Sequence, residues 1–251
     1  MKLEFKDVIN KHKGSPAIVL AHGPSLNTYL NKLENLKNSG YILIGCNEWF
    51  SFYKSTPPHY HVLANNIYTI NKLYQTMNQY DTTVVYADSV DLTDRKWVEE
   101  HLKCNYLPYD QRHNNSSPCG CSYPCCSRII KGRLTIQEEL VKYSNINERY
   151  GSGDTVALHS MSLAILLGCN PIYFIGIDLD YSLGFASHKE RLIDDIDVNN
   201  KTQVACMNDY TDQNIKNLII INKSAIAVGT SILNLNKSTK FDIFPIGEIA
   251  C

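Results

Sequence analysis

Short apolar runs alternate with longer amphipathic stretches along most of the chain. The apolar runs are rich in β-branched residues, which is typical of strands buried on both faces of a parallel sheet. The longer stretches repeat apolar residues along one helical face and predict amphipathic helices. We therefore predict an α/β fold, a Rossmann-like open and mostly parallel sheet flanked by helices. The predicted strands cover residues 17–21, 41–47, 60–65, 82–88, 171–178 and 231–235, and the predicted helices cover residues 25–36, 67–80, 94–103, 134–144, 156–167 and 212–228.

Two stretches depart from this alternation. Residues 104–132 hold three prolines and five of the nine cysteines, and they predict a Cys-rich insertion. So long an irregular stretch is uncommon inside a compact domain. Residues 179–210 are polar and weakly patterned, which predicts a small lid segment. Because 251 residues suit one domain, we predict a single α/β domain over residues 1–251.

The charge balance limits the classes of partner. The chain is 44% hydrophobic and 20% charged, with a formal net charge of −1, so we expect no nucleic-acid partner and no attraction to anionic membranes. The first residues lack the apolar core of a secretory signal, and no apolar run reaches the roughly 18 residues of a membrane span. We therefore expect a cytoplasmic protein with reduced cysteines.

Hydrogen-bonding residues follow the predicted strands. In open parallel sheets ligands bind beyond the carboxyl ends of the strands, so these positions are candidate binding residues. Glycine lets backbone approach a ligand, proline stiffens the turn, and the next helix start can take a phosphate. The alternative is an ordinary turn in which the serine caps the helix. The candidates are His22, Gly23, Pro24 and Ser25 after the first strand, Asn47 at the end of the second, Asn65 at the end of the third, and Asp178 at the end of the strand at 171–178.

A second candidate site precedes the apolar helix at 156–167. The segment GSGDT contains Gly151, Ser152, Gly153 and Thr155, whose backbone and hydroxyl groups suit an anion. Arg149 lies close enough in sequence to add a positive charge. The alternative is an ordinary helix cap.

An ordered set of short segments resembles a known superfamily. AHGPSL, GCNEWF, NERYGSG and LGCNPIYFIGIDLDY occur in this order between residues 16 and about 246. Together they resemble the bacterial sialyltransferases of glycosyltransferase family 42, the related domain of motility accessory factors, and the MptE-like 6-hydroxymethylpterin diphosphokinases (DUF115). The resemblance implies a GT-A-like variant of the Rossmann-like fold. It also implies a nucleotide-sugar-binding domain whose donor, a sialic or other nonulosonic sugar, is linked to CMP.

The resemblance also implies roles for individual residues. The first turn and Asn47 and Asn65 would bind the nucleotide or its sugar. Arg149 and Ser152 would line the donor and acceptor site, and Tyr181 would face the leaving phosphate. The implied catalytic set is therefore His188, Tyr181, Ser152 and Arg149, and the implied donor-binding set is His22, Gly23, Pro24, Ser25, Asn47, Asn65, Gly153, Thr155 and Asp178.

The chain departs from the sialyltransferase pattern at two points. His22 stands where those enzymes usually have asparagine, and their histidine before the late helix is missing from VACMNDYTDQN. His188 instead matches the histidine of the accessory-factor and diphosphokinase branch, so it is our hypothesis for the general base.

Three functions stay open from the sequence. The first is a metal-independent glycosyltransferase that uses a glycan or other hydroxyl acceptor and assembles as a homo-oligomer. The second is a pyrophosphate transferase that uses Mg-ATP, although Asn65 and Asn66 stand where that branch has carboxylates. The third is a catalytically silent nucleotide- or sugar-binding module.

Four cysteines lie close together in CGCSYPCC. Cys119, Cys121, Cys125 and Cys126 are numerous enough for zinc, but the spacing is not a repeated CxxC, and adjacent thiols share one tetrahedral site poorly. We therefore favour reduced surface thiols and predict no metal site. For Asp178 we favour a structural or ribose-contacting role over metal binding.

Overall fold

The computed structural model describes residues 1–47, 49–53, 55–63, 73–87, 92–109, 135–147, 155–179, 201–239 and 242–249. Within these ranges, residues 51–52, 92–95 and 201–213 are described by their backbone alone.

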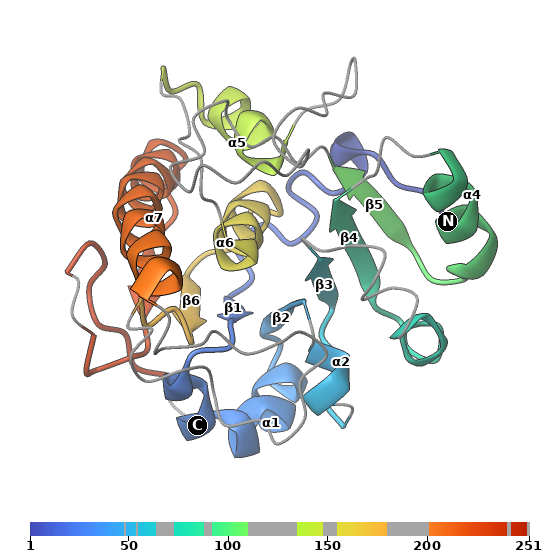
Figure 1. Cartoon of the computed structure of the whole chain (residues 1–251), viewed down its shortest axis with the longest axis horizontal. Coiled ribbons are helices and arrows are strands. Elements are labelled where there is room, and N and C mark those ends of the chain that lie inside the picture. Colours follow the sequence, from blue (N-terminus) through green and yellow to red (C-terminus); the bar gives the residue numbers. More distant parts are fainter. Residues whose placement is uncertain are drawn as a thin grey trace.

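A seven-stranded sheet forms the centre of the molecule, with the strand order β5-β4-β3-β2-β1-β6-β7 (Figure 1). Every pair of neighbouring strands is parallel, which confirms the predicted open α/β sheet. The strands are short and almost wholly buried, as their apolar composition predicts. They are β1 (Ala17–Leu20), β2 (Ile42–Cys46), β3 (Tyr60–Leu63), β4 (Thr83–Ala87), β5 (Tyr106–Tyr109), β6 (Ile172–Ile175) and β7 (Ile232–Asn234).

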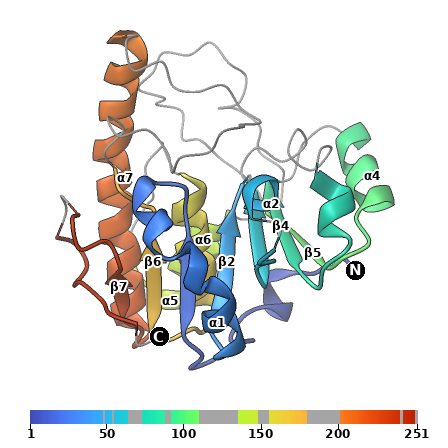
Figure 2. The ribbon, with the colours of Figure 1, turned by 90° about the horizontal axis from the view of Figure 1, so that it is seen from below.

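Helices cover both faces of the sheet (Figures 1 and 2). Alternate residues of β1 enter different cores, with Val19 on one face and Ile18 on the other. The Val19 face packs against α5 (Ile136–Ser144), α6 (Val156–Leu166) and α7 (Lys201–Ala227). The other face carries α1 (Leu33–Asn38), α2 (Trp49–Phe52) and α4 (Leu92–His101).

Helix α6 is the central helix of its layer and lies against β1, β2, β3 and β6. Every residue from Ala157 to Leu166 is buried, so the prediction of a buried apolar helix is confirmed. The helix ends at Leu166, and Gly168, which follows the C-cap residue Leu167, has a left-handed φ of +77°.

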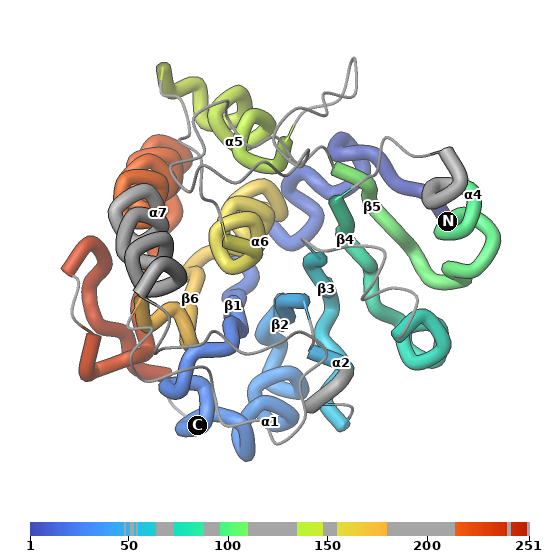
Figure 3. Tube along the Cα trace, viewed as in Figure 1, coloured from blue at the N-terminus to red at the C-terminus, as the bar shows by residue number. Residues whose placement is uncertain are grey.

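Both edges of the sheet are covered by other parts of the chain. The N-terminus lies beside α4 (Figure 3), and Leu3 donates a backbone hydrogen bond of 2.8 Å to Tyr106 of β5. At the opposite edge, Asn234 of β7 donates to the Pro245 carbonyl at 2.9 Å, and Gly247 donates back to Asn234 at 2.8 Å. Residues 245–247 therefore run alongside β7 and pair with its open edge.

Three predicted segments differ from the structure. The single helix over 25–36 is wrong: two 3₁₀ turns, η2 (Pro24–Thr28) and η3 (Leu30–Lys32), precede α1. Residues 106–109 of the predicted irregular insertion form β5, where Pro108 is tolerated because β5 is an edge strand. Helix α7 begins at Lys201, so the last ten residues of the predicted lid, 201–210, are helical.

The lid and insertion themselves stay predictions, since residues 110–134 and 180–200 lie outside the described residues. The described helices include none that is long and apolar enough to cross a membrane.

Candidate functional site

The sheet changes its winding direction at β1. From β1 the chain builds β2 to β5 on one side and then places β6 and β7 on the other. The turns that leave β1 and β6 therefore meet at a topological switch point, where open α/β sheets bind their ligands. His22, Gly23, Pro24 and Ser25 form the first turn, and Asp178 belongs to the second.

The two turns are in direct contact. The Gly23 N–H donates to the Gly176 carbonyl at 2.8 Å, and the Gly176 N–H donates to Ser25 Oγ at 3.0 Å. A Cβ on Gly23 would lie 2.5 Å from the Gly176 carbonyl oxygen and would overlap Asp178 Oδ2. Glycine at position 23 is therefore required by packing within the protein, while its predicted approach to a ligand stays a prediction.

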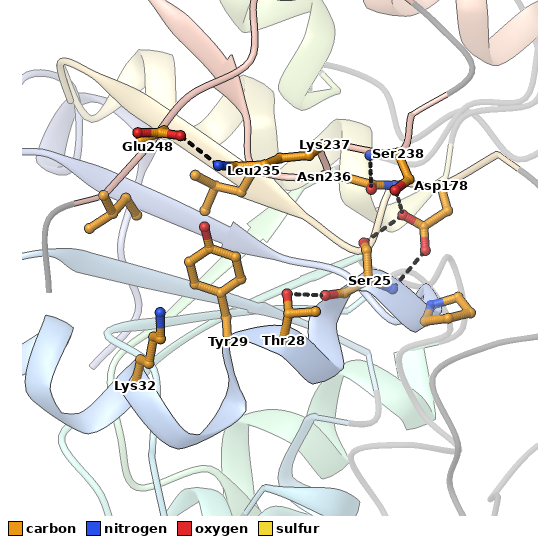
Figure 4. Close-up of a pocket in the computed structure, with 12 residues that line it drawn as sticks. Ser25, Thr28, Tyr29, Lys32, Asp178, Leu235, Asn236, Lys237, Ser238 and Glu248 are labelled. Atoms are coloured by element: carbon orange, nitrogen blue, oxygen red, sulfur yellow. Dashed lines mark hydrogen bonds and ion pairs between the residues drawn. The ribbon is translucent and has the colours of Figure 1, made fainter.

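The Asp178 carboxylate joins the ends of three strands (Figure 4). Its Oδ1 accepts from Ser25 Oγ at 2.5 Å and from Asn236 Nδ2, beyond β7, at 2.8 Å. Its Oδ2 accepts from the Ser25 backbone N–H at 3.0 Å. The N-cap of η2 is Gly23, without a side-chain cap hydrogen bond, so the alternative of Ser25 as a capping residue is wrong. We call Ser25, Asp178 and Asn236 the strand-end triad; it fixes the position of both turns, which supports the structural role favoured for Asp178.

A pocket opens beside the strand-end triad, with a volume of about 730 Å³. This size is typical of small-molecule sites. Its walls come from η2–η3 on one side and from residues 235–238 and 248–249 on the other (Figure 4). Pro24, Ser25 and Asp178 are the strand-end candidates that line it. The remaining lining residues are Thr28, Tyr29, Lys32, Leu235, Asn236, Lys237, Ser238, Glu248 and Ile249.

Two histidines hold the end of β2. The ring Nε2–H of His22 donates to the Cys46 carbonyl at 2.8 Å, and that of His61 donates to the Asn47 carbonyl at 2.5 Å. Asn47 has a left-handed φ of +38°. Burial lowers the pKa of His61 to about 3, so this ring is neutral. His22 thus faces β2, while the binding roles of His22 and Asn47 stay predictions.

The start of α6 lies at the same edge of the sheet, because α6 runs antiparallel to the strands (Figure 2). Thr155 is its N-cap residue, but its side chain makes no cap hydrogen bond. In the first turn, the buried His159 side chain hydrogen-bonds Gln137 of α5. Its ring packs against the Tyr109 ring, with 5.3 Å between the two ring centroids. This turn is therefore tied to α5 and β5.

Several predicted residues cannot be compared with the structure. Asn65, Arg149, Ser152, Gly153, Tyr181, His188 and the four clustered cysteines lie outside the described residues. Among the described residues, no group of three histidine, cysteine or acidic side chains could hold a metal ion.

Two asparagines of this region were missed from the sequence. Asn236 follows β7, and the strand-end rule that found Asp178 would have found it. Asn214 of α7 is fully buried, and its amide has no hydrogen-bond partner among the described residues. Leu218 and Ile221 continue the buried stripe of α7, so Asn214 lies one turn nearer the carboxyl ends of the strands. No pattern in the sequence distinguishes Asn214 from a surface residue.

Comparisons with known proteins agree with this architecture. A family model described as 6-hydroxymethylpterin diphosphokinase MptE-like matches residues 1–184. The MAf glycosyltransferase of Magnetospirillum magneticum AMB-1 is similar with a TM-score of 0.52 and 14% identity, over 96% of this chain but only 36% of that one. At this identity the likeness shows a shared fold.

A sialyltransferase is also similar. CstII from Campylobacter jejuni, in complex with cytidine-5′-monophosphate, has a TM-score of 0.49 and 13% identity over 93% of this chain and 85% of that one. A comparison with curated protein sequences gave no match.

Proposed function

Because the chain belongs to the 6-hydroxymethylpterin diphosphokinase MptE-like family, we propose that it is a transferase that binds a nucleotide-activated donor at the β1–β6 switch point. The observation that carries this proposal is the contact of the two strand-end turns through Ser25 and Asp178, beside a pocket of about 730 Å³. Ligands of open parallel sheets bind at such a point.

The finer proposal is glycosyl transfer from a CMP-linked sialic or nonulosonic sugar, without a metal. The strand-end candidates His22, Ser25 and Asn47 carry hydrogen-bonding side chains, which suits the recognition of a base and a ribose. The fold shared with the MAf glycosyltransferase supports the same reaction class.

This reaction sets two tasks for the protein. The bond between the sugar and the phosphate oxygen breaks, and negative charge grows on the leaving phosphate, which hydrogen-bond donors stabilise. The acceptor hydroxyl forms the new bond and gives its proton to a base. We assign the first task to Tyr181 and Ser152 with Arg149, and the second to His188, on the resemblance set out above.

The second candidate is transfer of a diphosphate from Mg-ATP to a hydroxymethylpterin. The description of the matching family, over residues 1–184, favours it. The products distinguish the two reactions, since glycosyl transfer releases CMP and diphosphate transfer releases AMP.

Thermal-shift measurements on the full chain separate these functions. CMP, CDP, UDP, GDP and ATP are each tested with and without magnesium, and the stabilising nucleotide is then supplied in its donor form. Stabilisation by CMP without magnesium, followed by release of CMP from its sialic acid conjugate, supports glycosyl transfer. Stabilisation by ATP only with magnesium, followed by pterin-dependent AMP release, supports the second candidate.

Two variants locate the site. Ser25→Ala, which removes a triad hydroxyl, should weaken nucleotide binding about tenfold, while exposed Ser39→Ala should leave it unchanged. Binding of a nucleotide without turnover of its donor form would contradict the transferase proposal and leave a silent binding module. No stabilisation by any of the five nucleotides would refute the nucleotide site.

A further inference from the structure

The pocket beside the strand-end triad has two different ends. Asp178 and Lys32 stand at opposite ends of the close-up (Figure 4). The Asp178 carboxylate already accepts three hydrogen bonds. Lys32, in contrast, has no carboxylate within 4 Å in the described part of the chain, and its ammonium lies 5.4 Å from the centre of the Tyr29 ring. The pocket therefore presents a cation beside an aromatic ring at the end far from Asp178.

The walls of the pocket are fixed by hydrogen bonds within the protein. Asn236 donates to Asp178 and accepts from the Ser238 N–H at 2.9 Å. On the facing wall, Thr28 Oγ1 donates to the Ser25 carbonyl at 2.8 Å. These contacts fix the local conformation of each wall, so a ligand would not need to order the walls. The Ser238 hydroxyl makes no hydrogen bond with a described residue and is available to a ligand.

The outer wall comes from a segment beyond the family match. That match ends at residue 184, whereas residues 235–238 and 248–249 form the wall that follows β7. Lys237 and Glu248 form an ion pair of 2.5 Å at the rim, with 66% and 76% of their side chains exposed. The charges of Lys237 and Glu248 compensate each other. Among the described residues that line the pocket, Lys32 is therefore the cation without an acidic partner.

We propose that this pocket binds an acidic carbohydrate, whose carboxylate pairs with Lys32 and whose ring packs on Tyr29. A single cation matches a single carboxylate, whereas a nucleoside diphosphate or triphosphate would bring several negative charges to one lysine. A sugar ring has an apolar face for Tyr29 and hydroxyl groups for the polar wall.

The role of this carbohydrate as acceptor rests on the proposed function. A ligand that fills the pocket from Lys32 to Ser25 ends at the switch point, where the donor would present its reacting carbon. Its hydroxyl would then attack that carbon, the nucleotide phosphate would leave, and the hydroxyl proton would pass to the base.

Binding of three probes to the full chain tests the pocket. Glucuronate, glucose and inorganic phosphate are compared by titration calorimetry and by saturation-transfer NMR. Glucuronate should bind at least tenfold more tightly than glucose and phosphate, because it alone combines the carboxylate with a sugar ring. Phosphate binding as tightly as glucuronate would overturn the carbohydrate assignment, and so would equal binding of glucose.

Two variants assign the contact of the carboxylate. Lys32→Gln should weaken glucuronate binding about tenfold or more. Lys142→Gln, an exposed lysine of α5 on the opposite face of the sheet, should leave it unchanged. Unchanged glucuronate binding in Lys32→Gln overturns the proposal.

Nucleotide binding distinguishes this proposal from the preceding one. Lys32→Gln should keep the nucleotide affinity of the native chain. A parallel loss of nucleotide affinity would mean that the pocket holds the nucleotide, and it would overturn the carbohydrate proposal. Glucuronate binding that persists in a chain without nucleotide affinity would refute only the proposed donor site.

Discussion

Gly23→Ala is the substitution that tests the contact between the two strand-end turns most directly. Gly23 has φ −67° and ψ 156°, a conformation that alanine adopts freely. Backbone preference alone therefore predicts a stabilisation of about 0.4–1 kcal/mol. The structure predicts the opposite, because the new methyl group would lie 2.5 Å from the Gly176 carbonyl oxygen, where real contacts of this kind stay above 3.0 Å.

The expected loss of stability in Gly23→Ala follows from the movement of the two strand-end turns. To admit the methyl group, the turns after β1 and β6 must separate, which lengthens the Gly23–Gly176 bond and the bonds of Ser25 to Gly176 and Asp178. Two or three such bonds at about 1 kcal/mol each give a destabilisation of about 2–3 kcal/mol. A substitution that forces atoms into a packed contact falls in the same range.

Urea unfolding of Gly23→Ala and Gly40→Ala measures this effect. Gly40 has φ +88° with open space around its Cα, so alanine there loses only about 1–2 kcal/mol from backbone strain. The order of stability should be native, then Gly40→Ala, then Gly23→Ala. Asp178→Ala should also destabilise less in the Gly23→Ala background than alone, because the same contacts are already lost. A Gly23→Ala protein as stable as the native chain would refute this packing argument.

Other predictions follow from buried groups. The folded pKa of His61, lowered to about 3 by burial, lies below the unfolded value near 6.5, so its share of stability is complete above pH 6.5 and falls as the pH drops. The free energies of unfolding measured in urea at pH 7 and at pH 4.5 should differ by up to about 2.5 kcal/mol because of His61. His61→Gln should reduce this difference. Burial raises the pKa of Cys46 and of Cys169 to about 12, so alkylation of the native protein at pH 8, read by mass spectrometry, should spare both until urea is added. Trp49→Phe should lower the free energy of unfolding by about 1–3 kcal/mol, since the Thr56 carbonyl loses the indole N–H at 3.0 Å; an unchanged urea midpoint would contradict it.

Most of the fold could be predicted from the sequence because its signals are local. The buried strands carry uninterrupted apolar runs, and α6 combines an apolar run with Gly168 at its end. The helix predicted over 25–36 failed for a non-local reason. Its first turn is held by Ser25, which bonds Asp178 across 153 residues, and no window of local sequence contains that bond.

The candidate site was predicted only in part. The carboxyl ends of β1 and β6 follow from the strand-end rule, and Ser25 and Asp178 were found by it. Tyr29 lies in the helix predicted over residues 25–36, and that prediction did not indicate that it lines the pocket. Lys237 and Glu248, which line the same pocket, lie more than 200 residues away from Tyr29, so the pocket exists only once β7 has been placed beside β6.

The switch point and the pocket wall beside it come from different parts of the chain. The switch point between β1 and β6 is complete by Asp178, inside the part of the chain that the family model matches. Residues 235–238 and 248–249 then add a wall to one side of that point, and Asn236 ties the wall to the same carboxylate that holds the β1 turn. A movement of the wall must therefore displace Asp178 and Ser25, because all three strand ends are hydrogen-bonded through the Asp178 carboxylate. By this route, a ligand seated against residues 235–238 and 248–249 would influence the turn proposed to hold the donor.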